Sequence, residues 1–107
     1  MSQWIDICPQ DDVVPGSGVC AQLGDAQVAV FRTGQDQFYA VGNHDPLGGA
    51  NVLSRGLIAE VKGTLTVASP LYKHHYCLRT GQCLQDEQVQ LPVYPVRVQD
   101  GLVQLAC

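Results

Sequence analysis

The sequence predicts an all-β protein, because short apolar runs alternate with glycine-containing turns along the whole chain. No segment keeps its apolar residues at the 3.6-residue spacing for the roughly ten to twelve positions that a helix needs. Nine runs have the length and composition of β-strands: Trp4 to Ile7, Val19 to Leu23, Gln27 to Phe31, Gln37 to Val41, Leu57 to Val61, Thr64 to Ala68, Tyr76 to Leu78, Tyr94 to Val98 and Leu102 to Leu105.

Three short turns predict that neighbouring strands pair antiparallel. Gly24-Asp25, Lys62-Gly63 and Asp100-Gly101 each separate two strand-like runs by the few residues that a tight β-hairpin requires. Hairpin pairing along a chain of short strands favours antiparallel sheets.

Two irregular segments interrupt this pattern and are candidates for a functional site. The first extends from Gly42 to Gly56, and the second begins at Ser69-Pro70, where the run from Thr64 to Ala68 ends. Long loops in compact domains are usually either functional or disordered, and the first loop contains too many apolar residues for a disordered linker. We expect the two loops to lie side by side.

Length and composition indicate one domain, residues 1–107, with few of the features of a nucleic-acid or membrane protein. The chain has 107 residues, is 46% hydrophobic and carries a net charge of −4. Its six basic residues are scattered, so we expect neither a nucleic-acid nor a membrane partner. With no export signal and no long apolar run, a cytoplasmic location is expected, and the five cysteines are interpreted as reduced thiols.

A concentration of histidine and cysteine in the second loop raises the possibility of a metal site. His74, His75, Cys77 and Cys83 lie within ten positions, but structural zinc sites usually draw on C-x2-4-C and H-x3-5-H pairs. Adjacent histidines on an extended segment point to opposite faces. The spacing therefore favours one half-exposed and one packed histidine over a zinc site.

Nucleophilic catalysis has no stronger support in the sequence. A reactive cysteine needs a nearby base, and the proximity of His75 and Cys77 along the chain does not establish that geometry. The neighbouring acids Asp86 and Glu87 are typical of a solvated loop.

The two loops resemble the ligand loops of Rieske [2Fe-2S] ferredoxin domains. Residues 43–50 read NHDPLGGA and residues 69–81 read SPLYKHHYCLRTG, beside the family patterns C-P-H-x-G-A and C-P-W-H-G-x-x-F-D-x-x-T-G. The segment YPVRVQDG at residues 94–101 is similar to the closing hairpin of that family. The resemblance implies a Rieske-like antiparallel β-sandwich in which these loops are equivalent to the cluster-binding loops.

The resemblance also indicates that all four ligand positions have changed. Asp45 and Leu47 stand where cysteine and histidine are expected in the first loop, and Ser69 and Tyr72 stand at the corresponding positions of the second. A Rieske cluster requires two thiolates and two imidazoles, so we expect no cluster and no metal in this chain. We expect Leu47 and Tyr72 to fill the vacated space, with the Tyr72 hydroxyl reaching Asp45 or Ser69.

Further segments are similar to the small subunits of bacterial NAD(P)H-dependent assimilatory nitrite reductases. These are MSQW at residues 1–4, NVLSRGLIAE at 51–60 and VASPLYK at 67–73. The similarity implies an accessory subunit that binds a large subunit, which would carry FAD, an iron-sulfur cluster and siroheme and reduce nitrite to ammonium. The isolated chain is then expected to have no catalytic activity.

Docking to such a partner is expected at the loop tips, near His44, Arg55, Lys73 and His74. An equally weighted interpretation is that Arg55 and Lys73 are ordinary solvated charges or anchor the loops internally. Two other functions remain open: an electron carrier with an unusual metal centre, and an interaction domain of another reductase. The residues available for such a centre are His44, Asp45, His74 and Cys77.

Overall fold

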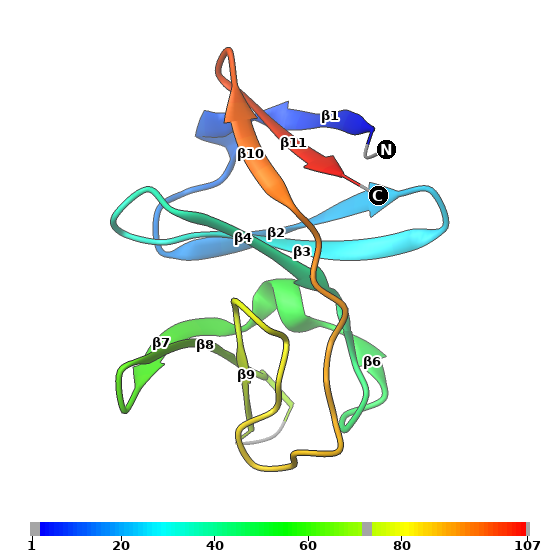
Figure 1. Ribbon diagram of the computed structural model, residues 1–107, viewed down its shortest axis with the longest axis vertical. Coiled ribbons are helices and arrows are strands. Elements are labelled where there is room, and N and C mark those ends of the chain that lie inside the picture. The colour runs from blue at the N-terminus through cyan, green and yellow to red at the C-terminus, as the bar shows by residue number, and fades with distance from the viewer. Residues whose placement is uncertain (1–2, 72–73, 107) are drawn as a thin grey trace.

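Four antiparallel sheets make up the computed structural model, which describes residues 3–71 and 74–106. Two three-stranded sheets face each other at one end of the molecule (Figure 1). The first contains β1 (Trp4–Pro9), β11 (Leu102–Ala106) and β10 (Val96–Gln99), in that order. The second contains β2 (Ser17–Leu23), β3 (Ala26–Arg32) and β4 (Phe38–Gly42). We call this end the sandwich end.

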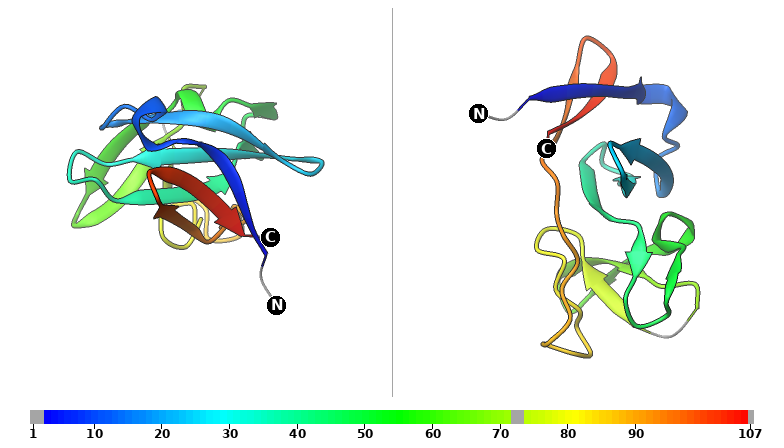
Figure 2. Two further views of the ribbon diagram at one scale, coloured as in Figure 1. Left: turned by 90° about the horizontal axis from the view of Figure 1, so that it is seen from above. Right: turned by 90° about the vertical axis from the view of Figure 1, so that its right-hand side faces the viewer.

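A third sheet and two loops form the opposite end, which we call the loop end (Figures 1 and 2). Its sheet contains β7 (Leu57–Val61), β8 (Thr64–Ala68) and β9 (His75–Cys77). The long first loop contains a two-stranded ladder and a short 3-10 helix: β5 (His44–Asp45), β6 (Ala50–Asn51) and η2 (Leu53–Arg55). A further 3-10 helix, η1 (Gln10–Asp12), follows β1.

The nine predicted strands and the antiparallel sandwich are confirmed. The turns Lys62-Gly63 and Asp100-Gly101 have positive φ at both residues, as the two-residue hairpin that follows the right-handed twist of its strands requires. Several strand ends differ from the prediction by one or two residues, and β10 begins two residues later than predicted. Tyr94 instead donates its N–H to Ala40 O of β4 at 2.9 Å, which joins this segment to the other sheet.

Each end of the molecule has its own apolar core. Valine and leucine side chains from both sheets fill the sandwich end, including Val28, Val30, Val103 and Leu105, together with Val13, which follows η1. The loop end is packed around larger side chains, among them Phe31, Leu53, Val67, Tyr76 and Leu78. Alternate residues of β3 face the two cores, so this strand joins them. Among the described residues no helix is long and apolar enough to cross a membrane.

The pairing of β8 with β9 brings the second loop against the first. Ala68 pairs with His75 and Val67 with Tyr76, and the Ser69 N–H donates to His74 O at 3.0 Å. The first loop is held by Asn43, whose side-chain amide donates to Asn51 O at 3.1 Å and whose Oδ1 accepts from the Ser54 N–H at 2.7 Å. Both loops therefore have defined backbones where they meet.

Candidate functional site

A buried carboxylate, Asp45, lies where the two loops meet. Its side chain has no exposed surface and accepts hydrogen bonds from three side chains. The Ser69 hydroxyl donates to Oδ2 at 2.5 Å, and the Tyr76 hydroxyl donates to Oδ1 at 2.7 Å. His74 Nε2 lies 2.9 Å from Oδ2 and 3.0 Å from Oδ1. We call Asp45, Ser69, His74 and Tyr76 the Asp45 cluster.

Two backbone groups complete the environment of this carboxylate. The N–H groups of Leu47 and Gly48 both donate to Asp45 Oδ1 at 3.1 Å, forming the local turn that aspartate side chains favour. A side chain at Gly48 would not fit, since a Cβ there would lie 2.9 Å from Asp45 Oδ2 and 2.6 Å from Leu71 Cδ1. The glycine thus lets the first loop approach the second closely.

The hydrogen bonds keep Asp45 ionised although it is buried. Burial raises the pKa of this carboxyl, but the donors Ser69, Tyr76, His74 and the Gly48 N–H outweigh burial and lower the pKa to about 2. An ionised carboxylate can only accept hydrogen bonds, so His74 carries a proton on Nε2. Burial and the neighbouring Asp45 raise the pKa of Tyr76, so its hydroxyl remains protonated and donates.

Two of the four residues that stand at Rieske ligand positions are in direct contact in the structure. Asp45 and Ser69 are joined by the short hydrogen bond between them. Leu47 does not fill the space as expected, because its side chain is 43% exposed. Its backbone N–H donates to Asp45, and the side chains of Tyr76 and His74 occupy the interior instead. Tyr72 lies outside the described residues.

The predicted docking residues occupy different environments. His44 is exposed and its Nδ1 lies 2.9 Å from Asn51 Oδ1, and Arg55 is also exposed. The assignment of His74 to a docking surface is wrong, since it is only 6% exposed and its ring is bound to Asp45. Lys73 lies outside the described residues.

The Asp45 cluster does not fit the iron-sulfur group that its resemblance to Rieske domains suggests. It offers a carboxylate, two hydroxyls and one imidazole, whereas a Rieske cluster takes two thiolates and two imidazoles. Across residues 3–71 and 74–106, no three acidic, histidine or cysteine side chains converge as a metal site.

Of the four residues considered for an unusual metal centre, only Asp45 and His74 are bonded to each other. His44 pairs with Asn51, and Cys77 is half-buried on β9. Burial raises the pKa of the Cys77 thiol, but hydrogen bonds from Thr80 and from the Arg79 N–H, with the Arg79 charge, lower it overall. Cys77 thus interacts with the turn that follows β9.

Sequence reasoning missed Tyr76 as the hydroxyl that reaches Asp45. The sequence predicts Tyr76 only as part of a strand, and it favours Tyr72 as the residue whose hydroxyl reaches Asp45 or Ser69. A signal was present, because a tyrosine within an apolar strand usually needs a partner for its hydroxyl when it is buried. The partner is 31 residues away in the chain, so its identity depends on the fold.

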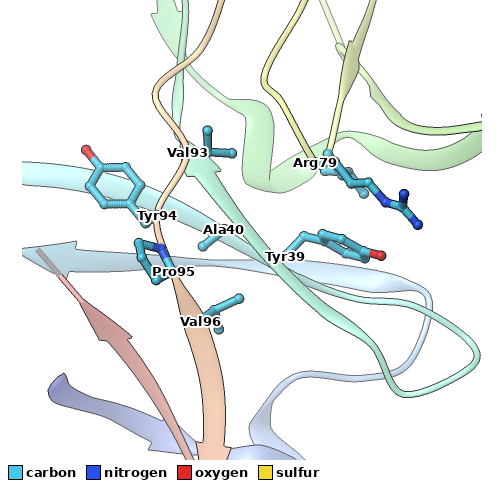
Figure 3. A pocket seen from close by; sticks show the side chains of 8 residues that line it. Tyr39, Ala40, Arg79, Val93, Tyr94, Pro95 and Val96 are labelled. Carbon is cyan, nitrogen blue, oxygen red and sulfur yellow. The ribbon is translucent and has the colours of Figure 1, made fainter. Parts of the chain in front are cut away.

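A separate groove of about 400 Å³ lies between β4 and the segment that leads into β10 (Figure 3). Its lining is mainly apolar, and the Arg79 side chain stands at its margin (Figure 3). None of the residues predicted from the sequence for a site lines this groove: Tyr39, Ala40, Leu78, Arg79, Val93, Tyr94, Pro95 and Val96. This groove is thus separate from the Asp45 cluster, on which the two loops converge.

Comparison with known proteins shows which family has this arrangement of strands and loops. The family model described as Rieske-like [2Fe-2S] domain matches residues 3–106. The chain is 56% identical over 106 residues to the nitrite reductase (NADH) small subunit of Escherichia coli (strain K12), covering 98% of each protein. The NMR structure of the E. coli protein NirD matches with a TM-score of 0.92 and 55% identity, over 100% of this chain and 98% of that one.

A third relative is a much larger protein. The nitrite reductase [NAD(P)H] large subunit of Klebsiella oxytoca is 46% identical over 101 residues, which are 94% of this chain and 10% of that protein. The chain belongs to the Rieske-like [2Fe-2S] domain family. Within that family, the resemblance to the small subunits of NADH-dependent nitrite reductase is confirmed.

Proposed function

We propose that this chain is the accessory small subunit of a cytoplasmic NAD(P)H-dependent nitrite reductase, an oxidoreductase of nitrate and nitrite assimilation. The observation that carries the proposal is the 56% identity to the E. coli small subunit over 98% of both proteins. Residues 1–107 act as one domain that binds the catalytic large subunit. Nitrite is reduced to ammonium on the large subunit, which holds FAD, an iron-sulfur cluster and siroheme.

The Klebsiella oxytoca relative supports the choice of partner. A segment similar to 94% of this chain is covalently part of a protein named as a nitrite reductase large subunit. Two polypeptides that are separate in one organism and joined in another usually work together, because fusion maintains a high effective concentration of each part for the other. The large subunit is thus the first partner to test.

The Asp45 cluster supports a binding role over electron transfer. The residues at the ligand positions are Asp45, Leu47, Ser69 and Tyr72, and the described three provide no thiolate or imidazole for iron. The chain therefore contributes a folded surface, on which His44, Arg55 and Lys73 remain candidate docking residues. It holds no cofactor of its own.

Co-purification and kinetics test this function. The tagged chain, produced in cells grown on nitrite, is expected to retain the large subunit, and nitrite-dependent NADH or NADPH oxidation by the large subunit should change when the chain is added. An unrelated β-protein of similar size serves as the control. Recovery of a different reductase would reassign the partner. A visible absorbance with stoichiometric iron in the purified chain would make it an electron carrier.

A further inference from the structure

Two leucines are exposed at the tips of the loops that meet at Asp45. Leu47 is 43% exposed and Leu71 is 44% exposed, and each follows an exposed proline. The Leu71 side chain lies over Gly48, the residue after Leu47, because a Cβ built on that glycine would be 2.6 Å from Leu71 Cδ1. The two leucines therefore belong to one surface, which we call the leucine face.

Both leucines are attached by their backbone to the Asp45 cluster. The Leu47 N–H donates to Asp45 Oδ1 at 3.1 Å, and the Leu71 N–H donates to Ser69 Oγ at 3.2 Å. Ser69 in turn donates to Asp45 Oδ2. Burying an ionised carboxylate is costly unless it is fully hydrogen-bonded, as Asp45 is. The same network that satisfies this charge also holds the backbone at two exposed leucines.

The charge distribution indicates what kind of surface can cover the leucine face. The sequence outside residues 43–92 carries six acidic and two basic residues, whereas residues 43–92 carry four of each. The net charge of −4 therefore belongs to the sandwich end. Within residues 44–51 and 69–71 the only acidic or basic side chain besides His44 is Asp45, which is buried. Interface centres are typically depleted of charge in this way.

The first and last strands, β1 and β11, lie on the side of the molecule away from the leucine face (Figure 1). Trp4 of β1 pairs with Ala106 of β11 at the sandwich end, away from the loops (Figure 1). When a homologous domain is fused to a large subunit, as in the Klebsiella oxytoca relative, the connecting chain would leave from the sandwich end. The leucine face then stays accessible to the protein to which the domain is joined.

We propose that the leucine face, formed by Leu47 and Leu71, docks on an apolar, uncharged patch of the nitrite reductase large subunit. This inference rests on the proposed function and refines the docking site, since it assigns the contact to Leu47 and Leu71 instead of to the exposed residues His44 and Arg55. An apolar contact of this kind depends weakly on salt, unlike one formed by exposed ion pairs.

The test replaces both leucines and measures binding to the large subunit by isothermal titration calorimetry. The pair Leu47→Ser and Leu71→Ser is expected to weaken binding by about tenfold or more, since buried apolar anchors dominate interface energetics. The control pair, Val14→Ser and Leu57→Ser, removes side chains that are 62% and 73% exposed elsewhere, and it should bind as the wild type does. Raising the salt concentration from 0.05 to 0.5 M is a further arm, with little change expected.

The outcomes separate this inference from the function on which it rests. If the wild type binds and the leucine pair binds equally well, or if binding collapses in high salt, the leucine face is not the docking site. If the wild type does not bind the large subunit, the proposed function fails first. A self-association of the wild type that the leucine pair abolishes would assign the face to a second copy and overturn the proposal. Thermal melts of both pairs verify that each variant is folded.

Discussion

Replacing Asp45 by asparagine removes the charge on which the two loops converge. Asparagine keeps one carbonyl oxygen but puts an NH2 group where the carboxylate accepts from Ser69 or His74. Two donors then face each other inside the protein. Breaking a buried, hydrogen-bonded charge network of this kind typically costs about 3 to 5 kcal/mol. We expect Asp45→Asn to destabilise the fold by an amount in this range at pH 7.

Part of this loss depends on pH, and its size follows from the pKa of Asp45. Folding lowers that pKa from 3.8 to about 2. A group with a lowered pKa stabilises the fold above its unfolded pKa, and its contribution disappears as the pH falls through its folded pKa. The contribution is about 2.5 kcal/mol at pH 7 and about half of that at pH 3, from 1.36 kcal/mol per pKa unit.

Urea unfolding of the wild type and Asp45→Asn at pH 7 and pH 3 measures this effect. The difference in free energy of unfolding between the two proteins should shrink by about 1 kcal/mol at pH 3, because the other acids titrate similarly in both and cancel. A difference that is the same at both pH values would refute the account of Asp45 as a buried carboxylate stabilised by its donors.

Two further predictions concern stability. Tyr76→Phe removes one donor to Asp45 and should cost about 1 to 2 kcal/mol in urea unfolding, while NMR titration shows the Asp45 pKa rising; an unchanged pKa would exclude the hydrogen bond. Gly81→Ala should cost at least about 2 kcal/mol, because φ is +79° and a Cβ would lie 2.1 Å from Leu91 O. Gly34→Ala has open space and serves as the control, expected within about 0.5 kcal/mol of the wild type. Equal thermal melts for the two glycine variants would contradict the close approach at Gly81.

The strands could be predicted from the sequence because β-structure leaves a local signal. The conformation of apolar runs such as Thr64–Ala68 and of hairpin turns such as Asp100-Gly101 can be predicted from their own residues, and both are present as expected. The ladder of β5 and β6 was not predicted, since two-residue strands have no periodicity of their own.

The site could be located from the sequence but its side chains could not be oriented. Aligning the loops placed Asp45 and Ser69 at equivalent positions, and these do meet. The same alignment could not show that Leu47 is exposed, because exposure depends on how the folded loop is packed. The roles of His74 and Tyr76 depend on the pairing of β8 with β9, which brings residues 29 and 31 positions away to Asp45.

Sedimentation velocity of the large subunit mixed with this chain tests the central claim most directly, provided that the iron content of the chain is measured on the same sample. The account predicts that the chain binds the large subunit saturably while containing no iron. Failure to co-sediment, or co-sedimentation only after reconstitution of the chain with iron and sulfide, would contradict it.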